Sequence, residues 1–306
     1  MKVLVTGAAG QVGRDLVDVL SQLSDNDHLV SGAVVARGGE GALAGRNIAV
    51  EVIPADRSVL DVTVREGVRR LLGELQPDVV IHAAAWTDVD GCEADPDRAF
   101  LVNALGTRNV AEAANDVGAH VCYISTDYVF DGRSQTPYVE WDDPHPLSVY
   151  GRSKRGGERE LFPGSTTVRT SWVCGVHGKN VVRTVLDAAS RGKSMRFVDD
   201  QHGCPTFSAD LSWMLARLAI ERRPGIFHVT NQGATTWFGF ARAVLEAAGR
   251  DPALVEPIST SQLDPPRPAP RPRYSILDNA ALRLSGIPLL ADWREPLVRV
   301  VGLLGG

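Results

Sequence analysis

Tyr150 and Lys154 stand four residues apart in the segment Tyr-Gly-Arg-Ser-Lys, within a predicted helix over 149–161. A four-residue spacing places both side chains on one face of a helix. A free tyrosine has a pKa of about 10, but a neighbouring ammonium favours the phenolate. The pair therefore suits general acid–base chemistry on a carbonyl or alcohol oxygen. A plain surface pair is the alternative, although a chance match is uncommon in a chain with five Tyr and four Lys.

A second candidate is the glycine-rich run Thr-Gly-Ala-Ala-Gly-Gln-Val-Gly, with Gly7, Gly10 and Gly13, between a predicted strand at 3–6 and a predicted helix at 11–23. Small residues let backbone N–H groups approach a pyrophosphate, and the helix N-terminus favours negative charge. The spacing is GxxGxxG rather than GxGxxG. Its position at the first strand–helix junction favours a dinucleotide site over a structural turn.

The identity of the dinucleotide is predicted from the tip of the second expected strand, 29–36. Arg37 follows this strand, and its tip carries no acidic residue. Dinucleotide-binding folds commonly place an acid there for the ribose hydroxyls. The planar guanidinium of Arg37 suits a 2′-phosphate instead. We therefore expect NADPH, with NADH still possible, and the alternative is that Arg37 is a solvated loop residue.

Thr126 lies at the end of a strand expected at 121–125. In an open α/β sheet the carboxyl ends of the strands line the ligand crevice. A hydroxyl there can hydrogen-bond a reacting carbonyl oxygen and stabilise developing negative charge. Threonine at a strand end is more often a turn residue, so the interpretation depends on Tyr150 belonging to the same sheet.

The elements that must position these residues alternate along the first part of the chain. Strands are expected at 3–6, 29–36, 79–82 and 121–125, and helices at 11–23, 64–75 and from Asp95-Pro96 to about 118. This order is typical of a Rossmann-type, doubly wound parallel sheet, here over residues 1–172. Residues 173–306 are expected to form mainly a smaller C-terminal α/β substrate domain, with the chain returning to the first domain around 205–230.

In the second part, helices are predicted at 181–191, 209–220, 238–248 and 293–303, with a strand at 226–229. The proline-rich segment 264–273 cannot lie inside a helix or a central strand. It is interpreted either as a stiff surface linker or as a cationic loop aimed at a ligand.

Composition narrows the function classes. The 306 residues are 44% hydrophobic and 23% charged, with a net charge of −5, which is typical of a globular protein and argues against nucleic-acid binding. No apolar run approaches the ~20 residues of a membrane span, and the N-terminal run is too short for a secretory signal. The four cysteines are dispersed and show no zinc spacing. We expect a cytoplasmic protein without a metal motif.

Longer stretches carry a family resemblance. GQVG at 10–13, AAAWTDVD at 83–90, STDYVFDG at 125–132, PLSVYGRSK at 146–154, RTSWV at 169–173, DDQHGCPT at 199–206 and RPRYSILD at 271–278 resemble the dTDP-4-dehydrorhamnose reductases of the extended short-chain dehydrogenase/reductase superfamily. The resemblance runs over nearly the whole chain. It implies NAD(P)H-dependent reduction of the C4 keto group of a small-molecule dTDP-sugar, dTDP-6-deoxy-L-lyxo-4-hexulose, to dTDP-L-rhamnose.

The same resemblance implies roles for individual residues. Tyr150 would donate the proton, Lys154 would lower the tyrosine pKa and hold the nicotinamide ribose, and Thr126 would hydrogen-bond the keto oxygen. The cofactor positions would be Gly7, Gly10, Gln11, Val12, Gly13, Asp61, Val62, Ala83, Ala84, Ala85 and Thr87, beside Tyr150 and Lys154. The substrate positions would be Val89, Thr126, Asp127, Tyr128 and Trp172, and Arg271 would neutralise the diphosphate.

Other features of the resemblance leave alternatives open. Some relatives dimerise through magnesium held by glutamates. One such position is Asp15 here, shorter by a methylene, and we predict no metal requirement and either a monomer or a homodimer. The rival functions are another NDP-4-keto-6-deoxyhexose reductase and a non-catalytic NADP-binding regulatory subunit. The intact Thr126, Tyr150 and Lys154 argue against the second.

Overall fold

The computed structural model describes residues 1–24 and 49–305. Within them the centre of the molecule is a six-stranded sheet in the order β10-β5-β4-β3-β1-β2, with every neighbouring pair parallel. The strands are β1 (Lys2–Thr6), β2 (Glu51–Ala55), β3 (Val79–His82), β4 (His120–Thr126), β5 (Thr166–Thr170) and β10 (Gly225–His228). All of their carboxyl ends therefore meet at one edge, where a ligand crevice is expected.

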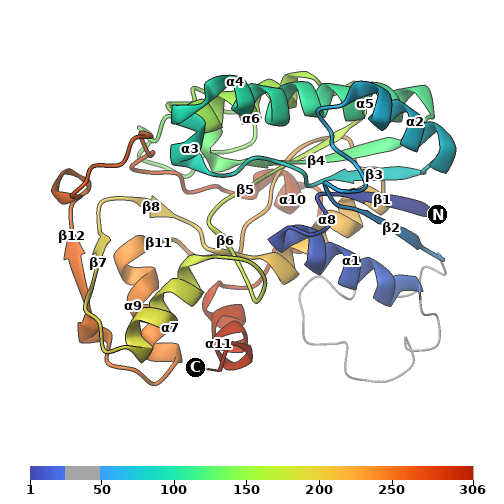
Figure 1. Cartoon of the computed structure of the whole chain (residues 1–306). Helices are drawn as coiled ribbons and strands as arrows, with labels where there is room; N and C mark the ends of the chain where they lie inside the picture. The colour runs from blue at the N-terminus through green and yellow to red at the C-terminus, as the bar shows by residue number, and fades with distance from the viewer. Residues whose placement is uncertain (25–48, 306) are drawn as a thin grey trace.

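Helices cover both faces of this sheet (Figure 1). On one face lie α1 (Gln11–Ser24) and α8 (Ser208–Ile220), and on the other lie α2 (Arg65–Leu75), α5 (Gly106–Asp116) and α6 (Val149–Arg159). Successive side chains of a strand point to opposite faces. Accordingly Val3 and Val5 of β1 pack in the α1–α8 core, whereas Leu4 packs in the α2–α5 core. Because side chains on both faces of β1 and β3 are buried, the sequences of these strands are nearly continuous hydrophobic runs.

The helix predicted from Asp95 to about 118 is helical over that length but is not one regular α-helix. It consists of α4 (Pro96–Phe100), a π-helical turn at Leu101–Leu105 and α5. The predicted cap is confirmed, because the Asp95 carboxylate accepts a hydrogen bond from the Arg98 backbone N–H at 3.1 Å. The π turn carries the buried Asn103, whose amide donates to Ser153 of α6 at 2.9 Å and so fastens the two helices together.

A second group of elements lies beside the sheet. It comprises the helices α7 (Val181–Ser190), α9 (Trp237–Ala247) and α11 (Arg294–Leu303). It also contains the paired short strands β7 (Met195–Val198) with β12 (Val255–Ile258), β8 (His202–Gly203) with β11 (Thr235–Thr236), and β6 (Val173–Cys174) with β9 (Thr206–Phe207). The helices α7, α9 and α11 share a separate hydrophobic core that includes Val185, Phe240 and Trp293. In contrast, α8, β10 and α10 (Ala280–Leu284) belong to the central sheet and its core.

The other short elements of the described residues are α3 (Val89–Ala94) and the 3-10 turns at Asp127–Val129, Pro252–Leu254 and Thr260–Gln262. The predicted helices of the second part and the strand at 226–229 are confirmed to within one or two residues. Segment 264–273 contains neither helix nor strand, as predicted. No helix in the described part of the chain is both long and apolar enough to cross a membrane.

The sequence interpretation missed β2 and β5. Pro54 and the exposed Glu51 disguise β2, which lies at the sheet edge, where a proline is tolerated. The strand expected at 29–36, and with it Arg37, lies outside the described residues. The neighbours of β1 are β2 and β3, so the strand tip next to the glycine loop carries Asp56 and Arg57.

Candidate active site

A cavity of about 420 Å³ opens at the carboxyl edge of the sheet. Its walls come from the glycine loop, the ends of β4 and β5, the first turns of α6, and the second group of elements. The sequence-predicted residues that line it are Gly7, Gly10, Gln11, Val12, Gly13, Ala83, Ala85, Thr87, Val89, Thr126, Asp127, Tyr128, Tyr150, Lys154 and Trp172. The dinucleotide loop and the tyrosine–lysine pair therefore face one space.

A second cavity, of about 300 Å³, adjoins the first and shares Gly7 and Gly10 with it. It takes in the other predicted cofactor positions, Asp61, Val62 and Ala84. The tip of β2 supplies Asp56 and Arg57, which sequence reasoning had not singled out. The two cavities together form a groove on both sides of the glycine loop.

The glycine loop needs glycine at two positions for different reasons. Gly7 has φ +67°, and a Cβ there would lie 2.7 Å from the Ala84 backbone nitrogen. A Cβ on Gly13 would lie 2.2 Å from the Gly7 carbonyl oxygen, so Gly13 lets α1 pack directly against the loop. The helix follows with no acidic residue in its first turn, so its N-terminal N–H groups face the cavity with a positive field.

The helix α6 fixes the tyrosine and the lysine at the cavity floor. Ser148 caps it by accepting a hydrogen bond from the Gly151 N–H at 3.1 Å. A Cβ on Gly151 would lie 2.1 Å from the Tyr128 carbonyl oxygen, so the helix start packs closely against the turn after β4. The Lys154 ammonium stands 4.1 Å from the centre of the Tyr123 ring, and the Tyr123 hydroxyl donates to the Lys154 carbonyl at 3.3 Å.

The charge states at the floor follow from burial. Burial raises the pKa of the Tyr150 phenol above its ordinary value, and the nearby Asp127 carboxylate raises it further. This differs from the lowering that the spacing to Lys154 suggested, and it leaves a protonated phenol at neutral pH. Burial lowers the pKa of Lys154 to about 7, against the opposing charge of Glu158. Burial also keeps His82 neutral, with a pKa of about 3.

Thr126 and Asp127 form the polar centre of the cavity. The Thr126 hydroxyl donates to Asp127 Oδ1 at 3.0 Å and accepts from the Tyr128 N–H at 3.2 Å. Burial raises the pKa of Asp127 to about 6. Its Oδ2 is buried and has no hydrogen-bond partner among the described residues. A hydroxyl donor of a ligand would satisfy this oxygen.

Two tryptophans close the side of the cavity away from the glycine loop. The rings of Trp172 and Trp237 stack with centroids 3.7 Å apart at an angle of 10°. Trp172 has a left-handed backbone with φ +47°, and a Cβ on Gly203 would lie 2.4 Å from its ring. Sequence reasoning missed Trp237 and Lys179, which also line the cavity. No local motif marks them, because they come from elements distant in sequence.

Among the predicted site residues that the structure describes, Arg271 is the one that lines neither cavity. Its guanidinium binds the Asp90 carboxylate at both oxygens, at 2.7 and 2.8 Å. The Ala269 N–H donates to the same carboxylate at 3.1 Å. The proline-rich segment is thus tied to α3, and the role of Arg271 toward a diphosphate stays a prediction.

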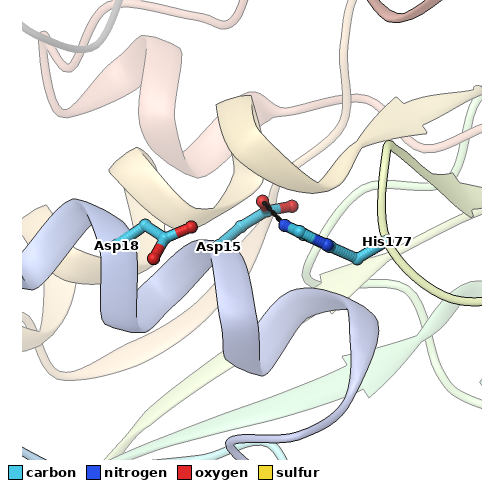
Figure 2. Close-up of side chains that lie close together, drawn as sticks. All are labelled: Asp15, Asp18 and His177. Carbon is cyan, nitrogen blue, oxygen red and sulfur yellow. Dashed lines mark ion pairs between the residues drawn. The ribbon is translucent and has the colours of Figure 1, made fainter. Parts of the chain in front are cut away.

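Asp15 and Asp18 of α1 lie close to His177, which follows β6 (Figure 2). His177 Nε2 is 3.6 Å from Asp15 Oδ1, and burial raises the pKa of Asp15. Beside them, Asn180 donates to Gln11 Oε1 at 3.3 Å. These contacts join the loop before α7 to the first helix. Carboxylates and imidazole are also metal ligands, so the expected independence from metal stays a prediction.

A parallel sheet with a glycine-rich turn after β1 and a tyrosine–lysine pair on a helix beside β4 defines a Rossmann-type dinucleotide-binding fold with a candidate active site. The chain belongs to the family described as the RmlD substrate binding domain, which matches it over residues 1–304.

Individual relatives agree with this assignment. The chain is 39% identical to a dTDP-4-dehydrorhamnose reductase of Streptomyces griseus, over 99% of this chain and 94% of the relative. It is 37% identical to a probable dTDP-4,6-dihydroxy-2-methyloxan-3-one 4-ketoreductase of Streptomyces antibioticus, over 97% and 93%. The crystal structure of a dTDP-4-dehydrorhamnose reductase from Bacillus anthracis in complex with NADP is similar with a TM-score of 0.84 and 34% identity, covering 100% of this chain and 99% of that one.

Proposed function

We propose that the protein reduces the C4 keto group of dTDP-6-deoxy-L-lyxo-4-hexulose to give dTDP-L-rhamnose, with NADPH as the cofactor. The observation that carries this proposal is the position of Tyr150 and Lys154, which face the same cavity as the glycine loop and Thr126. The relatives named as reductases of dTDP-keto-sugars support the choice of substrate.

The chain's own residues account for the proton and for the keto oxygen. NADPH, when bound, supplies the hydride that adds to C4 of the sugar. Tyr150 donates its phenolic proton to the resulting oxygen, so the carbonyl becomes a secondary alcohol and the tyrosine becomes a phenolate. The Thr126 hydroxyl hydrogen-bonds the same oxygen, and the Lys154 ammonium stabilises the phenolate until solvent returns the proton.

The residues at the tip of β2 fit a phosphorylated adenosine. Arg57 has a side chain that is 80% exposed, and its only ion pair among the described residues is a 3.3 Å contact to Asp61. An exposed pair of this kind is weak, so the guanidinium is available for a 2′-phosphate. The NADP complex of the Bacillus anthracis relative supports NADPH as the cofactor. We thus propose Arg57 for the contact that the sequence suggested for Arg37, a residue outside the described part of the chain.

We assign the two ligands to two parts of the chain, because the cores on the two faces of the sheet are separate from the core that α7, α9 and α11 share. Residues 1–172, joined by 205–230, carry the sheet and would bind the dinucleotide, whereas most of 173–306 would bind the sugar nucleotide. The stacked Trp172 and Trp237 would face the hexose, and the free oxygen of Asp127 would accept a sugar hydroxyl. The packing of α8 and β10 on the sheet supports the return of the chain to the first unit.

The test is a coupled assay that follows NADPH oxidation with dTDP-6-deoxy-L-lyxo-4-hexulose, with the product identified by NMR. The proposal expects turnover and the rhamno configuration at C4. The relative named as a 4-ketoreductase of another dTDP-sugar supports a different dTDP-4-keto-sugar reductase as the second candidate, and turnover to the C4 epimer would favour it. Stoichiometric NADPH binding without any turnover would point to a regulatory subunit instead.

A further inference from the structure

Glu158 lies one helical turn beyond Lys154 on α6, and its side chain is only 2% exposed. Its carboxylate binds three side chains. Oε1 accepts hydrogen bonds from the Ser125 hydroxyl at 2.6 Å and from Arg169 Nε at 2.9 Å. Oε2 accepts from Arg169 Nη2 at 3.0 Å and from Arg155 Nη1 at 2.6 Å. This carboxylate is therefore fixed from two strands and from its own helix.

The strand contacts of Glu158 reach the part of the sheet that holds the reacting groups. Ser125 of β4 and Arg169 of β5 are partners in the parallel register, and Arg169 is 1% exposed. Thr126, the proposed donor to the keto oxygen, follows Ser125 directly. A buried ion pair is weak evidence of stabilisation, because desolvation offsets much of the attraction. Stabilisation alone therefore does not explain the buried pair of Glu158 and Arg169, and the groups next to it suggest another role.

Lys154 has few charged neighbours. His82 of β3 faces it and is neutral, because burial lowers its pKa to about 3. Tyr123 of β4 lies under the ammonium and is uncharged, because burial raises its pKa well above the ordinary value. Tyr150 on the same helix is protonated for the same reason. Among the described residues that act on Lys154, Glu158 is thus the one negative charge.

Glu158 itself stays ionised despite burial. Hydrogen bonds and charge from Arg169, with further donors from Ser125 and Arg155, hold the pKa of its carboxyl below the ordinary value. From β10, His228 also faces this cluster, but burial keeps it neutral with a pKa of about 3. The carboxylate consequently presents a permanent negative charge one turn away from Lys154.

We propose that Glu158 is a positioning residue for the acid–base pair, whose anchored carboxylate keeps the buried Lys154 side chain charged and holds α6 against β4 and β5. The role of the Lys154 charge in proton transfer rests on the proposed function. The charge state of Lys154, however, is a property of the chain that can be measured without turnover.

The chain contains only four lysines, Lys2, Lys154, Lys179 and Lys193, so NMR of protein labelled with ¹³C at the lysine ε position gives few signals. Lys154→Met identifies the signal of interest by its loss. The wild-type signal is expected to titrate near pH 7, the value to which burial lowers the pKa of Lys154. In Glu158→Gln the midpoint is expected to fall, by about one pH unit, because the variant removes the opposing charge one helical turn away that raises the pKa of Lys154.

Glu160→Gln is the matched control, since this residue follows on the same chain segment but pairs with the half-exposed Arg108. It should leave the Lys154 midpoint unchanged. Glu158→Gln alone leaves Arg169 buried and unpaired, which can prevent folding. The double variant Glu158→Gln with Arg169→Met removes both charges and should show the same direction of shift. A folded variant without Glu158 in which the Lys154 midpoint does not move would overturn the proposal.

Turnover provides the second arm. In the folded Glu158 variants the fall of kcat at alkaline pH should begin about one pH unit earlier than in the wild type. A purely structural role would lower kcat at every pH without moving that limb, and this would overturn the link to Lys154. If Lys154 of the wild-type protein titrates as expected but the protein does not reduce the dTDP-sugar, the proposed function is wrong and the assignment of Glu158 still holds.

Discussion

The floor and the rim of the cavity are built in different ways. At the floor, Tyr150 and Lys154 are 9% and 2% exposed and stand on a helix packed against the central sheet. At the rim, Arg57 is an exposed side chain at a strand tip in the adjoining cavity, and Trp172 and Trp237 are half-buried side chains from separate segments. The floor is held from several strands, whereas at the rim Arg57 makes one exposed ion pair among the described residues and the two tryptophans stack on each other.

This difference separates two requirements of one reaction. Proton transfer and charge stabilisation need groups held rigidly at a low dielectric, and the sheet with α6 provides this. Choice of nucleotide and sugar needs contacts that can differ between relatives without disturbing that centre. Changes at the floor should therefore lower kcat, and changes at the rim should raise KM for one ligand at a time.

The largest effect is expected at the floor. Tyr150→Phe removes the proton donor and should lower kcat by about 10²–10⁴-fold, the contribution of a positioned acid. NADPH binding, followed by cofactor fluorescence, should be largely retained. Tyr138→Phe is the control, because its hydroxyl bonds Asp131 away from the cavity. Turnover near the wild-type rate in Tyr150→Phe would remove the acid role.

At the rim, Arg57→Ala should raise KM for NADPH by about tenfold and leave KM for NADH nearly unchanged, because a hydrogen bond to a charged group contributes about 1.5–3 kcal/mol. The measurement is the ratio of kcat/KM for the two cofactors. Arg69→Ala, an exposed arginine that pairs with Asp116, is the matched control. An equal loss with both cofactors would exclude Arg57 as the 2′-phosphate contact.

A smaller effect is expected on the sugar side of the rim. Trp237→Ala removes the ring that holds Trp172, a proposed hexose contact, by stacking. An aromatic pair contributes about 1 kcal/mol beyond its buried area, so KM for the dTDP-sugar should rise about fivefold. The kcat should change little, since the floor is untouched. Trp141→Ala, at a site that is 67% exposed, serves as control. A large fall in kcat with an unchanged KM would place Trp237 in the chemistry instead.

The same contrast explains what the sequence could predict. The glycine loop and the pair Tyr150 and Lys154 are local patterns, and each belongs to one strand–helix unit whose periodicity is visible. The contacts of Trp237 and Glu158 form only when strands and helices distant in sequence come together. The residues next to them in the sequence therefore do not predict these contacts. The position of Arg57 at a strand tip could not be predicted, because Pro54 disguises the edge strand before it.

Asp127 lies between floor and rim, and its substitution should show the smallest effect, on stability. Its folded pKa, raised by burial to about 6, exceeds the ordinary value of 3.8. Between these values the folded state keeps a proton that the unfolded state releases, so stability falls as pH rises through this window and the loss is complete above it. Asp127→Asn should therefore raise Tm by a few degrees at pH 7.5.

The sign of this prediction can be checked within the same segment. The advantage of Asp127→Asn should shrink as the pH of thermal unfolding is lowered toward 5, because the wild-type carboxyl then regains its proton. For Asp131, burial acts against ionisation, but hydrogen bonds from Tyr138 and the Arg133 N–H outweigh it and lower the pKa. Asp131→Asn should accordingly lower Tm at pH 7.5. A Tm difference for Asp127→Asn that is constant with pH would show that packing, and not the buried charge, sets it.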